Sequence, residues 1–131
     1  MRLKALGLGF VLLALAGCVS VHRYDPIDIY QRTQSYKKYS FDVVWSAALK
    51  SIDEMEFAVK KATKKVGLIH AETDVNPDPR YLPPVMNVII KEVDGGIEVN
   101  FHIELPGQRD ESRKRKTYAN RFFRALRKYL R

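Results

Sequence analysis

The fold is decided by the stretch Val85–Leu105, VMNVIIKEVDGGIEVNFHIEL. Its second half alternates without a break, with apolar residues at every odd position from Ile97 to Leu105 and polar residues between them. A period of two is typical of a strand with one buried face. The segment Asp94-Gly95-Gly96 separates the two halves, and glycine pairs favour tight turns. The stretch therefore predicts an antiparallel hairpin that is apolar on one face and polar on the other.

The pairing of the two strands depends on the length of this turn. A turn made by Gly95 and Gly96 would place Ile90 opposite Phe101 and keep the apolar side chains on a common face. A three-residue turn would place polar residues opposite apolar ones. We therefore expect an even-numbered turn at Gly95-Gly96.

Amphipathic helices are predicted on both sides of this hairpin. Ser40 is a suitable N-cap, and apolar residues recur at helical spacing from Phe41 to Met55. A second apolar stripe lies near the C-terminus and is expected to be buried. It comprises Tyr118, Ala119, Phe122, Phe123, Leu126, Tyr129 and Leu130.

The remaining segments complete an α+β domain over residues 40–131. Phe57–Ala62 and Leu68–Thr73 are typical of short strands, and Asp74–Pro84 contains four prolines that favour a surface loop. The predicted order is helix, two strands, loop, two strands, helix. An antiparallel four-stranded sheet with both helices on one face would bury every apolar stripe.

The N-terminus is typical of a targeting segment. Arg2 and Lys4 precede 12 uncharged residues, Ala5–Ala16. This run is too short to cross a bilayer core, which needs about 20 residues, but it has the length of a signal-peptide apolar region. The chain's only cysteine, Cys18, follows directly. A single cysteine excludes an internal disulfide.

Leu15-Ala16-Gly17-Cys18 resembles the lipobox of bacterial lipoproteins. The resemblance implies that the signal peptidase recognises Leu15, Ala16 and Gly17, removes residues 1–17 and leaves a diacylglyceryl group on Cys18. Val19 stands where an aspartate is associated with inner-membrane retention, so the resemblance implies the outer membrane, facing the periplasm. An ordinary signal peptide and a buried N-terminal helix are the alternatives.

Residues 18–39 are expected to be the lipidated cysteine and a tether. Four of the seven tyrosines fall here: Tyr24, Tyr30, Tyr36 and Tyr39. They either dock on the domain, with residues from about Thr33 as an alternative edge strand, or form an aromatic surface for a partner.

FDVVWSAALKSI (Phe41–Ile52) and VGLIHAE (Val66–Glu72) resemble the small α+β domains of uncharacterised bacterial lipoproteins. They are similar, more distantly, to the helix-grip domains of a lipoprotein component of the outer-membrane β-barrel assembly machinery. The resemblance implies a binding or scaffolding module and carries over no catalytic residue.

Charge is concentrated at the C-terminus. The chain has 23 Lys and Arg against 15 Asp and Glu, and residues 109–131 hold ten of the former and two of the latter. A basic surface indicates an anionic partner, and an exported chain would not meet nucleic acid. Candidates are an envelope protein, peptidoglycan and anionic headgroups, whereas a merely solvated helix face is the alternative. The candidate contacts are Arg113, Lys114, Arg115, Lys116, Arg121, Arg124 and Lys128.

The polar sheet face carries the candidates for catalysis. His70 and His102 are expected there beside Glu72, Glu98 and Glu104, which allows a hydrolase hypothesis. His22, His70 and His102 lack metal-ligand spacing, so no metal is expected. No nucleophile elbow or phosphate-binding glycine loop occurs. We therefore expect a non-enzymatic module with no cofactor beyond the covalent lipid.

Overall fold

The computed structural model describes residues 29–73, 82–106 and 112–131. The elements follow one another as β1 (Ile29–Tyr36), α2 (Phe41–Glu54), β2 (Phe57–Thr63), the short 3₁₀ helix η2 (Lys64–Val66), β3 (Leu68–Thr73), β4 (Val85–Val93), β5 (Gly96–Glu104) and α3 (Ser112–Tyr129). All strand pairs are antiparallel, in the spatial order β1-β5-β4-β3-β2.

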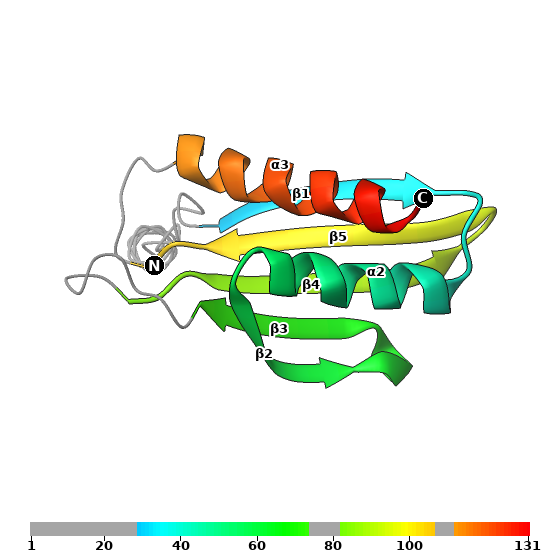
Figure 1. Ribbon diagram of the computed structural model, residues 1–131, viewed down its shortest axis with the longest axis horizontal. Coiled ribbons are helices and arrows are strands. Elements are labelled where there is room, and N and C mark those ends of the chain that lie inside the picture. Colours follow the sequence, from blue (N-terminus) through cyan, green and yellow to red (C-terminus); the bar gives the residue numbers. More distant parts are fainter. Residues whose placement is uncertain (1–28, 74–81, 107–111) are drawn as a thin grey trace, which may run out of the picture.

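The elements form two layers (Figure 1). α2 and α3 lie side by side on one face of the sheet and run in opposite directions. The predicted α+β class and the predicted placement of both helices on one face are therefore confirmed. Among the described residues, no element covers the opposite face of the sheet.

The predicted number of strands is wrong, because the sheet has five strands instead of four. The additional strand, β1, lies in the segment expected to be a tether, and it pairs with β5 from Ile29–Glu104 to Tyr36–Ile97. Its helix-facing positions carry tyrosine, arginine and glutamine, so it lacks the aliphatic alternation that reveals β5. The alternative of an edge strand within this segment is the correct one.

The hairpin turn is displaced by one residue from the expected position. Asp94 and Gly95 form it, and Gly96 already pairs with Val93 as the first residue of β5. Val88 therefore faces Phe101, a shift of two that preserves the two faces. Gly95 adopts a φ of 85°. A side chain is excluded at Gly96, because a Cβ there would lie 2.6 Å from the Tyr36 carbonyl oxygen at the end of β1.

The core lies between the helices and the sheet. Phe101 at its centre stacks on Phe122, with ring centroids 5.0 Å apart, and meets Phe123 edge-on at 6.1 Å. α2 begins as predicted at Ser40, whose Oγ accepts a hydrogen bond from the Val43 amide. Fully buried apolar residues of every element except β1, β2 and η2 complete the core. They include Val44, Ile52, Ile69, Met86, Val88, Val99, Ile103 and Leu126.

Five of the seven residues of the predicted stripe of α3 are buried, and Tyr118 is partly buried. Tyr129 is 37% exposed, although it was expected to be buried. Arg115, expected on the surface, is only 4% exposed. It precedes Ala119 by four residues and Phe122 by seven, and this spacing places it on the buried side of the helix.

Segments beside the core agree in part with expectation. Tyr30, Tyr36 and Tyr39 are partly buried and pack against the core, so these three dock on the domain as one alternative predicted. Tyr24, Cys18 and the lipobox-like residues lie outside the described part of the chain, as do residues 74–81 of the proline-rich loop. No helix in the described ranges is long and apolar enough to cross a membrane.

β2 forms the second edge of the sheet. Its pairing with β3 is interrupted between Val59 and Lys61, where the register shifts. Lys60 and Lys61 are exposed there. This edge is therefore both irregular and positively charged.

Candidate functional site: the groove between the two helices

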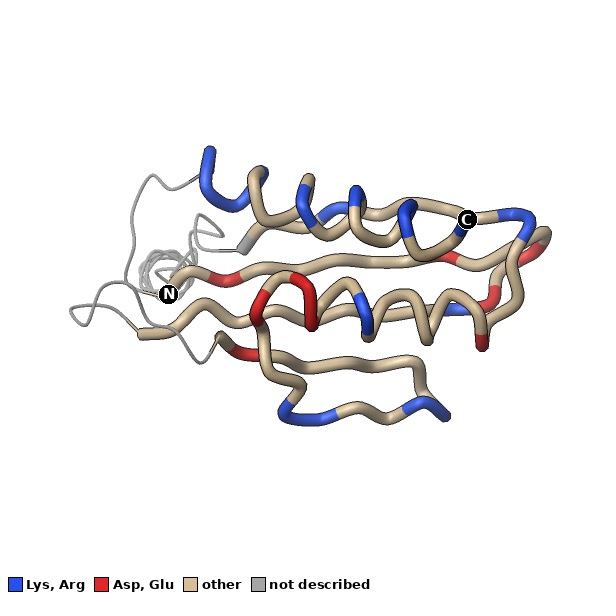
Figure 2. The backbone as a smooth tube through the Cα atoms, in the orientation of Figure 1, with Lys and Arg blue, Asp and Glu red and all other residues tan. Residues whose placement is uncertain are grey.

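Exposed cations follow the whole length of α3 (Figure 2). Of the seven predicted contact residues, Arg115 is buried and the other six are exposed. Three stand at the start of the helix, and we call them the N-terminal cations: Arg113, Lys114 and Lys116. Three stand further along, and we call them the groove cations: Arg121, Arg124 and Lys128. At a rise of about 1.5 Å per residue, the latter lie about 12 to 22 Å beyond Arg113.

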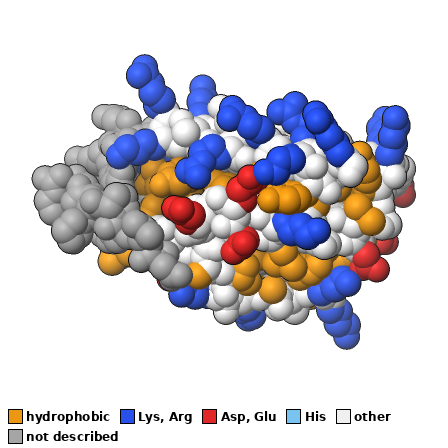
Figure 3. Space-filling view, in the orientation of Figure 1, with side chains coloured by type: hydrophobic (Ala, Val, Ile, Leu, Met, Phe, Trp, Pro, Cys, Tyr) orange, Lys and Arg blue, Asp and Glu red, His pale blue; other side chains and the backbone are white. Residues whose placement is uncertain are grey.

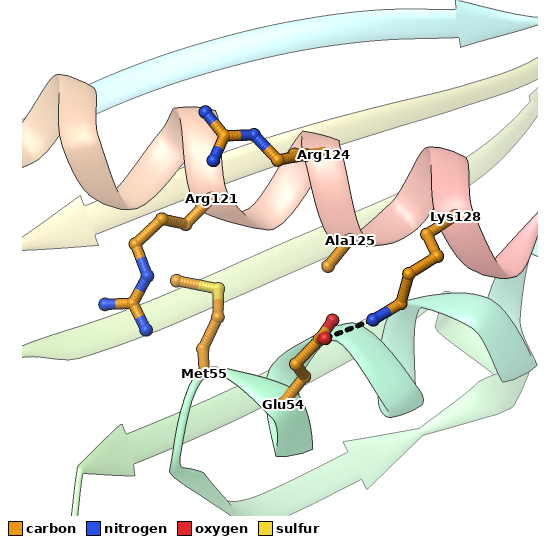
Figure 4. Close-up of a pocket in the computed structure, with 6 residues that line it drawn as sticks. All are labelled: Glu54, Met55, Arg121, Arg124, Ala125 and Lys128. Carbon is orange, nitrogen blue, oxygen red and sulfur yellow. Dashed lines mark hydrogen bonds and ion pairs between the residues drawn. The ribbon is translucent and has the colours of Figure 1, made fainter.

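The groove cations line a single depression of about 300 Å³ between α3 and the end of α2 (Figure 4). Its floor is formed by the apolar side chains of Met55 and Ala125, which are almost entirely buried. Arg121 extends alongside Met55 from the facing helix. Of the described residues that line the groove, Glu54 alone is acidic.

Lys128 and Glu54 close one side of the groove. The Lys128 ammonium donates a hydrogen bond to Glu54 Oε1, and this bond raises the pKa of Lys128. Lys128 therefore remains charged at physiological pH. Because the negative charge of Glu54 balances that of Lys128, the net positive potential of the groove comes chiefly from Arg121 and Arg124.

Contacts with two lysines account for the exposure of Tyr129, which was predicted to lie in the core. Its ring centroid lies 4.9 Å from the Lys128 ammonium and 6.0 Å from that of Lys50 on α2. Both distances fit cation–π contacts. Tyr129 thus bridges the two helices at the surface instead of filling the core.

The basic surface continues beyond this groove. A second depression of about 420 Å³ at the end of α3 is lined by Arg124, Arg127, Lys128 and Arg131. Figure 3 shows blue side chains gathered over α3, with patches of apolar surface between the helices. Guanidinium groups stay charged at any physiological pH and match carboxylate or phosphate oxygens in pairs. This arrangement can hold an anionic group that carries an apolar neighbour.

The catalytic candidates lie on the opposite, open face of the sheet. His70 Nδ1 lies 2.7 Å from Asn87 Oδ1, and Nε2 lies 3.3 Å from Glu72 Oε1. These neighbours fix the imidazole and occupy both ring nitrogens. His102 lies in β5, directly opposite Asn87 of β4. The structure therefore brings His70 together with Glu72, as the hydrolase hypothesis requires, and neither Asn87 nor Glu72 carries the hydroxyl or thiol of a Ser, Thr or Cys nucleophile.

The three candidate carboxylates of this face lie at different separations. Glu98 and Glu104 are six residues apart on β5, or about 20 Å at a rise of about 3.4 Å per residue, which is too far for a glycosidase pair. Glu72 and Glu104 are both in register with Val85 of the strand between them, so their backbones are about 10 Å apart. The face also carries Leu68, Val85 and Ile89, so it is mixed and not wholly polar as predicted. Within residues 29–73, 82–106 and 112–131, no three His, Cys, Asp or Glu side chains gather closely enough to hold a metal ion.

Comparison with known proteins shows likeness in fold alone. No protein-family model matches the chain, and no curated protein matches it. Among solved structures, a hypothetical protein of Helicobacter pylori has a TM-score of 0.56 at 8% identity, covering 84% of this chain and 92% of that one. An uncharacterised protein from Bacillus thuringiensis has a TM-score of 0.52 at 10% identity, covering 78% and 95%.

A third structure, DynU16 from the dynemicin biosynthetic locus, has a TM-score of 0.50 at 14% identity. The match covers 79% of this chain and 47% of that one. At such identities the likeness shows a shared α+β fold and nothing further.

Proposed function

We propose that this protein is a lipid-anchored lipoprotein of the cell envelope, attached through Cys18 to the outer membrane and facing the periplasm. Its domain serves as a non-catalytic binding or assembly-support module. The observation that carries the binding role is the groove between α2 and α3, where three cations and one paired carboxylate surround an apolar floor.

Support for the anchor comes from the sequence. A basic start, a short apolar run and the lipobox-like Leu15-Ala16-Gly17-Cys18 occur in the order that lipidation requires. Two or more acyl chains on one residue give stable attachment, at about 0.8 kcal/mol per buried methylene. An envelope location also accounts for a basic surface without nucleic acid.

The chemistry of the groove favours an acidic protein segment as the partner. Arg121 and Arg124 suit a carboxylate, while Met55 and Ala125 suit an adjacent apolar side chain. Peptidoglycan offers carboxylates as well, and it is the second candidate. Its sugars and short peptides make less use of the apolar floor.

The anchor is tested by the Cys18→Ala variant. We expect this variant to remain unprocessed or to leave the membrane fraction, because it cannot be acylated. Processing is read from the mass of the chain and attachment from fractionation of cells. Normal cleavage together with membrane retention would contradict the anchor.

The groove is tested by photo-crosslinking in intact cells from position 50, which adjoins it on α2. We expect capture of a defined envelope component, and loss of that capture in Arg121→Gln/Arg124→Gln. The matched variant Arg113→Gln/Lys116→Gln removes the same charge from the start of α3 and should retain it. Equal capture in all three forms would refute binding through the groove.

A further inference from the structure

We infer that the N-terminal cations of α3, Arg113, Lys114 and Lys116, rest on the anionic phosphates of the bilayer that holds Cys18. The domain then stands on the membrane by this end, and the groove cations lie about 12 to 22 Å further along α3. The inference rests on the proposed anchor and adds an orientation to it.

The first step is that β1 and α3 run in the same direction. Arg32 of β1 donates a hydrogen bond from Nη1 to Asn120 Oδ1 at 2.7 Å, and its guanidinium lies 5.9 Å from the Phe123 ring centroid. Further along both elements, Arg127 lies close enough to Tyr36 to act on its pKa. Figure 1 shows the same parallel course.

The second step is that both elements begin at the same level. From Arg32 back to Ile29 is three residues of strand, or about 10 Å. From Asn120 back to Arg113 is seven residues of helix, again about 10 Å. Since Arg32 and Asn120 are in contact, Arg113 stands level with the start of β1.

The third step is the length of chain between this end and the anchor. Ten residues, 19–28, connect Cys18 to Ile29. Fully extended they span at most about 40 Å. The start of β1 is therefore held within about 40 Å of the bilayer, and with it the start of α3.

The fourth step is charge. Residues 109–116 hold five Lys and Arg against two Asp and Glu. Cations at the start of a helix oppose its dipole, so the dipole does not favour them at this position. They are complementary to anionic headgroups, which attract basic residues near the surface. A membrane surface would thus be an electrostatically complementary partner for these cations.

The test uses the lipidated full chain in vesicles of phosphatidylglycerol and phosphatidylcholine. With Cys18 acylated, an introduced cysteine carries the only free thiol. A fluorophore is attached in Thr117→Cys, near the start of α3, or in Ser46→Cys, near the start of the oppositely directed α2. Both positions are exposed. With a quencher on the headgroups, we expect strong quenching at position 117 and weak quenching at position 46.

Charge variants identify the contact. Each neutralised cation should reduce the membrane-contacting population about fivefold, and Arg113→Gln/Lys114→Gln/Lys116→Gln about a hundredfold. The matched variant Arg121→Gln/Arg124→Gln/Arg127→Gln should keep the quenching at position 117. Replacing phosphatidylglycerol by phosphatidylcholine should abolish it.

The outcomes separate the orientation from the anchor. Equal quenching at both positions would overturn the orientation. Loss of quenching in the matched variant alone would also overturn it, because that result would show that the groove side lies on the bilayer. The mass of the chain and its sedimentation with vesicles report the anchor independently. An unlipidated, non-sedimenting chain overturns both proposals, whereas a lipidated chain without the expected difference overturns only the orientation.

Discussion

Gly67 shows how a single residue fixes the packing of two strands. It follows η2 with a φ of 72°, and its carbonyl accepts a hydrogen bond from the Ile90 amide at 2.8 Å. A Cβ at this position would lie 2.0 Å from the Ile90 carbonyl oxygen. Gly67→Ala therefore combines a left-handed backbone with a clash against β4, and we expect a loss of more than about 2 kcal/mol in the free energy of unfolding.

Gly95→Ala is the matched control for this prediction. Gly95 has a φ of 85°, but nothing lies within 4 Å of its expected Cβ. Its substitution should cost only the backbone term of about 1 to 2 kcal/mol. Urea denaturation of both variants measures the difference. Equal losses would show that the contact with Ile90 relaxes without cost.

Tyr36 should ionise unusually late. Burial raises the pKa of its phenol to about 12, and the charge of Arg127 offsets part of this shift. Because the folded pKa exceeds the unfolded value of about 10, this contribution to stability is present below pH 10 and is lost as the pH rises towards 12. An alkaline titration followed by phenolate absorbance should show a late component that disappears in Tyr36→Phe. Its persistence in that variant would contradict the assignment.

Among the elements, β1 offers the sharpest test, because sequence and structure disagree about it. It pairs with β5 over eight residues and brings Tyr30 and Tyr36 against the core. At about 1 kcal/mol for each hydrogen bond, its loss would remove a large part of a stability of about 5 to 15 kcal/mol. A chain beginning at Ser40 should therefore lack a cooperative unfolding transition, and one beginning at Asp28 should keep it.

Thermal unfolding and size-exclusion chromatography distinguish the two truncated chains. The shorter chain leaves the edge of β5 unpaired, so we also expect it to associate. A monomeric, cooperatively folded chain from Ser40 would show that β1 is dispensable.

Elements with a strong apolar period were predictable from the sequence, whereas β1 was expected only as an alternative, and only from about Thr33 instead of Ile29. The strand β3 has the expected bounds, and α2 starts at its expected cap, because alternation and capping are local signals. β1 carries Arg32 and Gln34 on its helix-facing side, which is tolerable only at an edge beside α3. The turn position was missed because it depends on the close approach of Tyr36 to Gly96.

At the scale of the whole molecule, the sequence indicated which cations are exposed but not which of them lie together in the candidate site. Six of the seven proposed cations are exposed, as the charge distribution indicated. The sequence did not reveal that Arg121 and Arg124 share a groove with Glu54 and Met55, because α2 and α3 are separated by most of the sheet in the chain. Helical spacing could have identified Arg115 as buried, since it falls on the stripe that contains Ala119.

The irregular edge at β2 would have a consequence if the chain is anchored to a bilayer, as proposed. Molecules held on a surface meet one another far more often than the same molecules in free solution. A flat, unpaired strand would then recruit the strand of a neighbour. The shifted register between Val59 and Lys61, together with the charge of Lys60 and Lys61, opposes such pairing. This edge would let many copies crowd together on one membrane and remain separate molecules.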